Sequence, residues 1–151
     1  MSEYSQKHAI TWDDIKRDCA ILTERLRTEF TVPDKILAVT RGGLIPAGLI
    51  CRALGIKKIE TIGLESYHGN KQGEILSVLK EADPAYLKNT LILDDLVDTG
   101  KTYMYMREKT TDCLFATLYA KPMGAQYSDC YVREFAQETW VDFPWEMDDD
   151  E

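Results

Sequence analysis

The stretch LILDDLVDTGKT, from Leu91 to Thr102, combines an apolar strand pattern, three carboxylates and a turn of the kind that binds phosphate. Its apolar start predicts a buried strand, and Thr99 to Thr102 (TGKT) predicts the beginning of a helix. Adjacent carboxylates repel each other, so Asp94 and Asp95 at the tip of the strand suit a hard cation or paired sugar hydroxyls. TGKT offers backbone amides, hydroxyls and a lysine to a phosphate. The segment therefore predicts a site for a phosphorylated sugar and its metal ion.

Three other interpretations of this stretch compete with a site for a phosphorylated sugar. A Walker A loop, GxxxxGK[ST], requires glycine at the position of Asp95, whose carboxylate would repel phosphate. An aspartyl-phosphate enzyme commonly has a DxD pair, but Leu96 and Val97 stand two residues beyond the paired acids. A solvated acidic turn remains the plain alternative, and three carboxylates within five residues of one strand tip argue against it.

The pattern of apolar residues predicts strands that alternate with helices along the chain. Expected strands are Lys35 to Thr40, Lys58 to Leu64, Ile75 to Leu79, Asn89 to Leu93, Cys113 to Tyr119 and Tyr131 to Phe135, and expected helices are Thr11 to Leu26, Leu44 to Leu54 and Tyr103 to Lys109. Thr11 is the expected cap of the first helix, Gly55 closes the second, and the polar segment Glu65 to Gly73 is expected to be a mobile loop. This order predicts an α/β domain with a mainly parallel sheet, which binds ligands beyond the carboxyl ends of its strands.

Composition and charge restrict the class of protein. The 151 residues, 44% of them apolar, predict a single domain over residues 1–147, followed by a disordered acidic tail at 148–151 that carries half of the formal net charge of −8. This charge argues against nucleic-acid binding, and no apolar run has the length of a membrane helix. Without a signal peptide, the expected location is the cytoplasm. The four cysteines are widely separated and form no CxxC pair, so neither a zinc site nor a disulfide framework is supported.

With these residues in view, the chain resembles the type I phosphoribosyltransferases over nearly its full length, and in particular the bacterial xanthine-guanine branch. Leu91 to Thr102 matches the diphosphate-ribose motif of that superfamily. Further matching segments are Thr11-Trp12-Asp13, Val39 to Pro46, Glu65-Ser66-Tyr67, Ala120-Lys121-Pro122 and Glu138 to Trp145, of which the last two mark the 6-oxopurine branch.

The resemblance implies an enzyme that binds 5-phosphoribosyl 1-diphosphate (PRPP) with Mg²⁺ and displaces diphosphate as a purine base attacks C1 of the ribose. It implies that Asp94 and Asp95 hold the ribose hydroxyls, that Asp95 also reaches the metal, and that Asp98 is the general base near purine N7. It further implies that Thr99, Gly100, Lys101 and Thr102 cradle the 5-phosphate. The implied fold has a central sheet flanked by helices, a mobile flap and a small C-terminal hood.

The arginine turn at the end of the first expected strand agrees with this assignment. Arg41 and the amides of Gly42 and Gly43 can neutralise a diphosphate leaving group, although a plain tight turn would have the same sequence. The resemblance also implies a strained or cis peptide between Thr40 and Arg41.

The purine and the flap are assigned through the resemblance as well. Lys121 is expected to donate to the 6-oxygen of the base, which the amino group of adenine could not accept. Trp140 offers a face for stacking, and the Val141 carbonyl can accept from a 2-amino group. Without the resemblance, Lys121 would be interpreted as an exposed strand-end charge and Trp140 as a core residue.

Ser66 and Tyr67 are expected on the flap that closes over the diphosphate. A basic residue in the flap of the family's best-known member aligns with Gly73 here, and Lys71 is the nearby substitute. The acidic ending DDDE also differs from the apolar segment of related enzymes, so membrane association does not carry over. A homodimer or homotetramer is expected.

Two hypotheses follow from the sequence. The first is a Mg²⁺-dependent purine phosphoribosyltransferase that salvages guanine, xanthine or hypoxanthine. The second is a regulatory protein that senses PRPP or a nucleotide with the same fold. The retention of Asp98, Lys121 and Trp140 favours the enzyme.

Overall fold

The central sheet fixes the position of every later feature. The computed structural model describes residues 4–70 and 73–146, with side chains for all of them except 66–70 and 73–75. Within that part of the chain, six strands pair in the order β4-β3-β2-β5-β6-β7. Their bounds are β2 Lys35–Thr40, β3 Lys58–Asn70, β4 Gly73–Lys80, β5 Leu91–Val97, β6 Leu114–Ala120 and β7 Arg133–Glu134. All neighbours are parallel except β3 and β4, which confirms the mainly parallel α/β fold.

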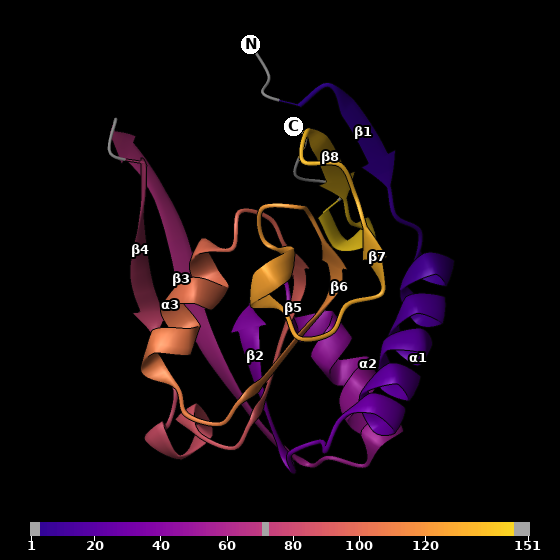
Figure 1. Ribbon diagram of the computed structural model, residues 1–151, viewed down its shortest axis with the longest axis vertical. Coiled ribbons are helices and arrows are strands. Elements are labelled where there is room, and N and C mark those ends of the chain that lie inside the picture. The colour runs from indigo at the N-terminus through magenta and orange to yellow at the C-terminus, as the bar shows by residue number, and fades with distance from the viewer. Residues whose placement is uncertain (1–3, 71–72, 147–151) are drawn as a thin grey trace.

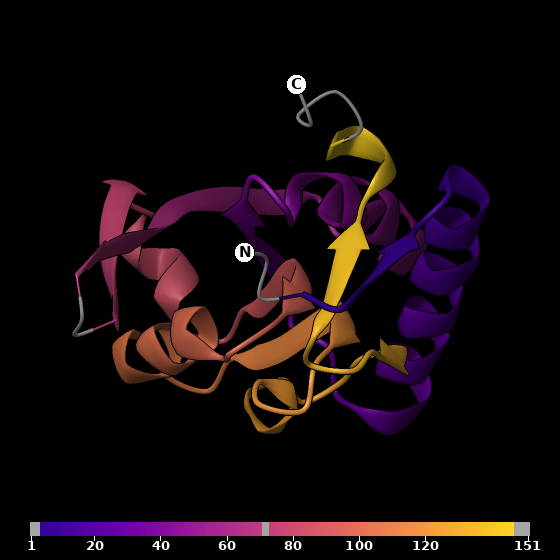
Figure 2. The same ribbon diagram turned by 90° about the horizontal axis from the view of Figure 1, so that it is seen from above.

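Helices cover both faces of this sheet (Figures 1 and 2). α1 (Trp12–Glu29) and α2 (Leu44–Leu54) lie on one face, and α3 (Lys101–Lys109) lies on the other. Neighbouring residues of each strand point to opposite faces, so Ile36 packs in the cluster under α1 and α2 while Leu37 packs with Tyr103 of α3. Short 3₁₀ helices form at η1 (Pro84–Leu87), η2 (Ala125–Tyr127) and η3 (Pro144–Glu146). None of the helices in the described ranges is long and apolar enough to cross a membrane.

The helix ends follow the sequence signals. The Thr11 hydroxyl accepts from the Asp14 amide at 3.0 Å, and the Asp14 carboxylate accepts from the Thr11 amide at 2.9 Å, which completes a capping box. Gly55 closes α2 in the left-handed conformation, with φ of 72°. Both expected caps are therefore confirmed.

A second, small sheet forms the hood of the molecule. β1 (Gln6–Ala9) pairs in parallel with β8 (Thr139–Asp142), and the two strands lie above the carboxyl ends of β5 and β6 (Figure 1). Segments near the two ends of the chain thus meet: Ser5 N donates to Glu138 O at 3.0 Å and Ile10 N to Asp142 O at 2.8 Å. The sequence patterns predicted neither strand, because each is only four residues long.

The segment from Glu65 to Gly73, expected to be a mobile loop, is instead part of a β-hairpin where the structure describes it. β3 continues through this segment to Asn70 and forms an antiparallel hairpin with β4, in which Ser66 is paired with Leu76 and Tyr67 with Ile75. The hairpin projects beyond the ends of β2 and β5 (Figure 1). A strand that extends past the helix-covered part of a sheet has no helix packed against it, so a polar sequence can form it and the expected loop is wrong.

β5 is also longer than expected. Pairing with β2 stops at Leu93, but pairing with β6 continues to Val97, so Asp94 and Asp95 lie within the strand instead of at its tip. β2 and β5 therefore separate where the acidic pair begins.

Glu60 fastens the base of the β3–β4 hairpin. Its carboxylate accepts from Asp83 N at 2.9 Å, from Lys80 Nζ at 2.9 Å and from Thr61 N at 2.8 Å. The Asp83 amide, followed by Lys80 and Thr61, lowers the pKa of Glu60 from 4.5 to about 2.

Stability should depend on this carboxylate in a defined pH range. A lowered pKa in the folded state stabilises the protein at pH values above the unfolded value of 4.5, and this contribution disappears as the pH falls to about 2. We expect Glu60→Gln to lower the free energy of unfolding at neutral pH and to approach the wild type at low pH. Urea unfolding at a series of pH values measures this difference. The exposed helical variant Glu108→Gln is the control, and a pH-independent deficit for Glu60→Gln would contradict the prediction.

Candidate active site

A crevice opens between β2 and β5, where the direction of strand addition reverses. From β2 the chain builds outward to β3 and β4, and from β5 it builds the other way to β6 and β7. Such a switch point is where open α/β sheets bind ligands. The peptide between Thr40 and Arg41 at the end of β2 is cis, as the resemblance implied.

Glycine is required in the turn after Arg41. A Cβ on Gly42 would lie 2.6 Å from the Asp95 carboxylate, and one on Gly43 would lie 2.5 Å from the Leu93 carbonyl oxygen. The turn therefore packs directly against β5. This contact brings Arg41 and the acidic pair to the two sides of one crevice, although they are far apart in the sequence.

The crevice contains a pocket of about 370 Å³. Its lining combines the arginine turn, the acidic pair and the end of the chain: Val39, Thr40, Arg41, Gly42, Leu64, Asp94, Asp95, Thr102, Trp145 and Glu146. Arg41 is exposed and can reach a ligand, whereas only 8% of the surface of Asp95 is accessible.

The acidic pair is electrostatically costly in this position. Burial raises the pKa of Asp94 well above its ordinary value, and the charge of Asp95 raises it further. Burial also raises the pKa of Asp95, with a further contribution from the charge of Glu146. Carboxylates held together in this way favour a bound cation, which would offset both the desolvation and the repulsion.

A larger pocket of about 700 Å³ lies over the start of α3. It is lined by Tyr4, Asp94, Leu96, Val97, Asp98, Thr99, Gly100, Lys101, Thr102, Tyr103, Met123, Gln137 and Glu138. Gly100 is the N-cap of α3, with φ of 95°, and the Thr99 hydroxyl accepts from Lys101 N at 3.5 Å. The turn thus presents a helix N-terminus, two threonines and a lysine to the pocket, which is the donor set that a phosphate requires.

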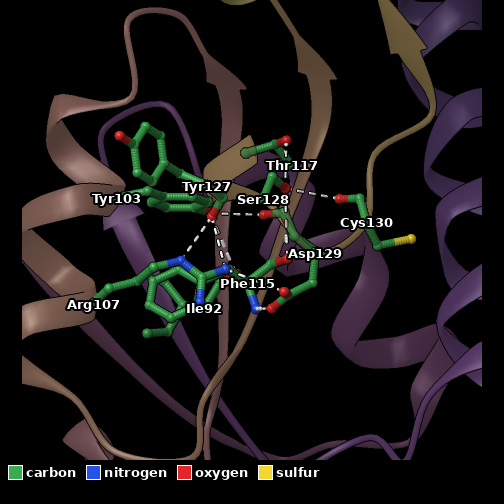
Figure 3. Close-up of polar contacts among 10 residues, drawn as sticks. Ile92, Tyr103, Arg107, Phe115, Thr117, Tyr127, Ser128, Asp129 and Cys130 are labelled. Carbon is green, nitrogen blue, oxygen red and sulfur yellow. Dashed lines mark hydrogen bonds and ion pairs between the residues drawn. The ribbon is translucent and has the colours of Figure 1, made fainter. Parts of the chain in front are cut away.

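The segment after β6 packs against the turn from Thr99 to Thr102. Arg107, near the end of α3, donates to the Tyr127 carbonyl at 3.1 Å from Nε and 2.9 Å from Nη2, and to Asp129 Oδ1 at 3.2 Å (Figure 3). The Tyr127 ring lies so close to Gly100 that a Cβ there would be 2.4 Å from Cδ2 of the ring. These contacts therefore hold the turn from Thr99 to Thr102 in place.

Gly100→Ala should be damaging for two physical reasons. Alanine in a left-handed conformation costs about 1–2 kcal/mol, and its methyl group would displace the Tyr127 ring. We expect a lower free energy of unfolding, measured in urea, and weaker PRPP binding, measured by calorimetry. The control is Gly48→Ala on α2, where the methyl group meets nothing within 4 Å and should stabilise the helix by about 0.5–1 kcal/mol. Wild-type stability and affinity in Gly100→Ala would contradict the prediction.

A third pocket, of about 160 Å³, contains the residues expected to recognise a base. It is lined by Tyr4, Asp95, Leu96, Asp98, Lys121, Trp140, Val141, Phe143 and Glu146. Lys121 is 1% exposed, and its Nζ lies 3.2 Å from Asp98 Oδ2. The ring of Tyr4 is 5.0 Å from the same Nζ and meets Trp140 edge-on at 5.0 Å.

The three pockets form one continuous site. Asp94 and Thr102 are shared by the first two described, Asp95 and Glu146 by the crevice and the small pocket, and Asp98 by the small pocket and the large one. Ser66 and Tyr67 lie on β3, but their side chains are outside the described part of the chain, as is Lys71, while Gly73 begins β4. All the other expected site residues come together here: Arg41, Gly42, Asp94, Asp95, Asp98, Thr99, Gly100, Lys101, Thr102, Lys121, Trp140 and Val141.

Among the residues that line the site, Tyr4, Gln137 and Glu146 carry polar groups that the sequence did not predict there. Tyr4 reaches the site only because β1 pairs with β8, a contact between opposite ends of the chain. Gln137 donates to Asp98 Oδ1 at 2.7 Å. None of the three belongs to a motif with a spacing that would have identified it.

Known proteins resemble this chain, one of them in sequence and all of them in fold. Residues 11–151 match the family model described as phosphoribosyl transferase domain. A purine phosphoribosyltransferase from Pyrococcus horikoshii is 33% identical, with 93% of each chain covered and a TM-score of 0.76. A xanthine-guanine-hypoxanthine phosphoribosyltransferase from Helicobacter pylori shares the fold at 20% identity, with 95% and 96% of the chains covered and a TM-score of 0.78. A hypoxanthine phosphoribosyltransferase from Trypanosoma cruzi does so at 20% identity, with 84% and 75% covered and a TM-score of 0.64. The chain described here therefore belongs to the phosphoribosyl transferase domain family, among the purine phosphoribosyltransferases.

Proposed function

We propose that this protein transfers the 5-phosphoribosyl group of PRPP to N9 of a 6-oxopurine, namely guanine, xanthine or hypoxanthine, and releases diphosphate. The observation that carries this proposal is the contact between the buried Lys121 ammonium and the Asp98 carboxylate in the small pocket. A lysine that is 1% exposed and faces a pocket has an ammonium group that a ligand oxygen can share.

The chemistry of the small pocket fits a 6-oxopurine. The Lys121 ammonium would donate to the 6-oxygen, while Asp98 accepts the proton of N7 as N9 bonds to the ribose. The indole of Trp140, 44% exposed, offers a face for stacking, and the Val141 carbonyl would accept from a 2-amino group. Adenine would place an amino group against the ammonium, and we propose that it is rejected for this reason.

The two other pockets fit the donor. Arg41 and the Gly42 amide would bind the diphosphate, the Asp94 and Asp95 carboxylates would accept from the ribose hydroxyls, and the turn from Thr99 to Thr102 would hold the 5-phosphate. Charge develops on the diphosphate as it leaves, so a cation at Arg41 stabilises the transition state more than the bound substrate. The hairpin of β3 and β4, with Ser66 and Tyr67, is proposed as the flap that shields the ribose from water.

The acidic pair also fits Mg²⁺. Among the side chains that the structure describes, which exclude those of residues 66–75, no group of three or more His, Cys, Asp or Glu could hold a metal ion alone. Mg²⁺ normally binds through one or two carboxylates together with substrate phosphates, so Asp95, with Asp94 beside it, would hold the ion jointly with PRPP. When bound, Mg²⁺ neutralises the diphosphate and lowers the cost of placing it beside two carboxylates.

We also propose a cytoplasmic homodimer or homotetramer. The resemblance of the sequence to the bacterial xanthine-guanine branch supports this proposal. Light scattering of the purified protein measures the oligomeric state.

The decisive experiment is a transfer assay with PRPP and each purine base, with and without Mg²⁺. We expect nucleotide and diphosphate in equal amounts with at least one 6-oxopurine, none with adenine, and loss of activity when the metal is chelated. Absence of product with guanine, xanthine and hypoxanthine would contradict the proposal. PRPP binding without transfer would instead favour the sensor hypothesis.

A further inference from the structure

Two side chains contact the Asp98 carboxylate, Lys121 and Gln137, and only Lys121 has a part in the proposed function. Lys121 contacts Oδ2 at 3.2 Å, and the side-chain amide of Gln137 donates to Oδ1 at 2.7 Å. The same amide nitrogen lies 3.4 Å from the carbonyl oxygen of Asp98. Gln137 therefore connects the carboxylate of Asp98 to its own backbone.

The orientation of the Gln137 amide is determined by its other end. Its Oε1 accepts from Met123 N at 2.8 Å, and a backbone N–H can only donate. The nitrogen must consequently face Asp98, whose carboxylate oxygen accepts from it. Thr139 N, which donates to Ala136 O at 3.0 Å, closes a turn around Gln137 between β7 and β8 and holds it in place.

Asp98 needs such a support because its surroundings do not fix it. Its side chain is 38% exposed, whereas Lys121 is 1% exposed. A half-exposed aspartate on a turn samples several rotamers, and a general base acts only from a geometry in which it reaches the proton. A carboxylate offers about four acceptor positions. The two contacts leave acceptor positions on both oxygens for a ligand.

We propose that Gln137 is a positioning residue for the transfer reaction, which holds the Asp98 carboxylate in the orientation that reaches purine N7. This inference rests on the proposed function. It predicts that Gln137 acts on turnover through Asp98, and not merely by fastening the turn between β7 and β8 to Met123.

Two substitutions separate these roles. Gln137→Glu keeps an oxygen for Met123 N but replaces the donor to Asp98 by a like charge, while Gln137→Met removes both contacts at similar size. We expect both variants to lower kcat about 10- to 100-fold, as for the loss of a hydrogen bond to a charged group, with little change in the KM for PRPP. Gln126→Glu, an exposed glutamine on η2, makes the same charge change as a control and should keep wild-type kinetics.

The outcomes distinguish the inference from the function on which it rests. Wild-type kcat in Gln137→Glu together with a loss in Gln137→Met would overturn the positioning role, because only the Met123 contact would then matter. A double variant with Asp98→Asn gives a second readout: Gln137→Glu should cost little further kcat in that background, and additive losses would overturn the inference. Normal transfer by the wild type and by both Gln137 variants would overturn the inference alone. No transfer by the wild type would overturn the proposed function and the inference with it.

Discussion

Asp98→Asn is expected to lower kcat about 10²- to 10⁴-fold, the usual loss when a general acid–base group is removed. An amide cannot take the proton that N7 releases. The amide NH₂ would also face one of the two donors that now contact Asp98, namely Lys121 and Gln137. Steady-state kinetics with a saturating 6-oxopurine measure the effect, and the KM for PRPP should change much less than kcat.

A matched control separates chemistry from folding. Asp112→Asn makes the same change at an exposed residue near the start of β6, where φ is 54° and asparagine tolerates that conformation. It should keep wild-type turnover and a wild-type thermal midpoint. Asp98→Asn leaves the buried Lys121 ammonium without its charged partner, so its midpoint should fall, and the turnover of both variants is measured well below their midpoints. An unchanged kcat in Asp98→Asn would remove Asp98 from the base role.

Local sequence determines much of the framework that positions this site. Thr11 and Asp14 cap α1 within one turn, and Gly55 ends α2, so their signals can be read from adjacent residues. The run Lys35–Thr40 is buried from Ile36 to Val39, because both faces of a central parallel strand are covered, and its continuous apolar pattern predicts that environment.

Longer-range pairing explains where the sequence-based expectations were wrong. The polar residues after Leu64 continue a strand because β4 supplies the backbone hydrogen bonds, and no side-chain pattern encodes that partner. The acidic pair likewise lies inside β5 because β6 still pairs there after β2 has turned away.

The residues of the site also divide into those that local sequence predicts and those that depend on long-range contacts. Residues within a motif, such as Asp98 or Gly100, were expected because the motif places them on one turn. Gln137 and Tyr4 were not, because their roles depend on contacts across the fold: Gln137 with Asp98, and Tyr4 with Lys121 through the pairing of β1 and β8. Lys121 stands between these cases, since only its near-complete burial distinguishes it from an ordinary lysine at the end of a strand.

Lys121→Met is the second prediction with a large expected effect. Methionine has a similar length but no donor, so the 6-oxygen of the base would face an apolar group in place of an ammonium. We expect kcat/KM for 6-oxopurines to fall about 10²-fold, the order of a lost hydrogen bond to a charged group. The KM for PRPP should change little, because Lys121 lines the small pocket and neither of the other two.

The stability of Lys121→Met makes the interpretation of its kinetics secure. Removing a buried ammonium relieves its desolvation, and the Asp98 carboxylate that loses this partner is 38% exposed and can bind water instead. The thermal midpoint should therefore not fall, in contrast to a variant that opens a cavity. Lys16→Met, at an exposed position of α1, is the control for the substitution itself. Equal losses in base and PRPP affinity would place Lys121 outside base recognition, whereas a loss confined to the 6-oxopurines assigns the ammonium to the 6-oxygen.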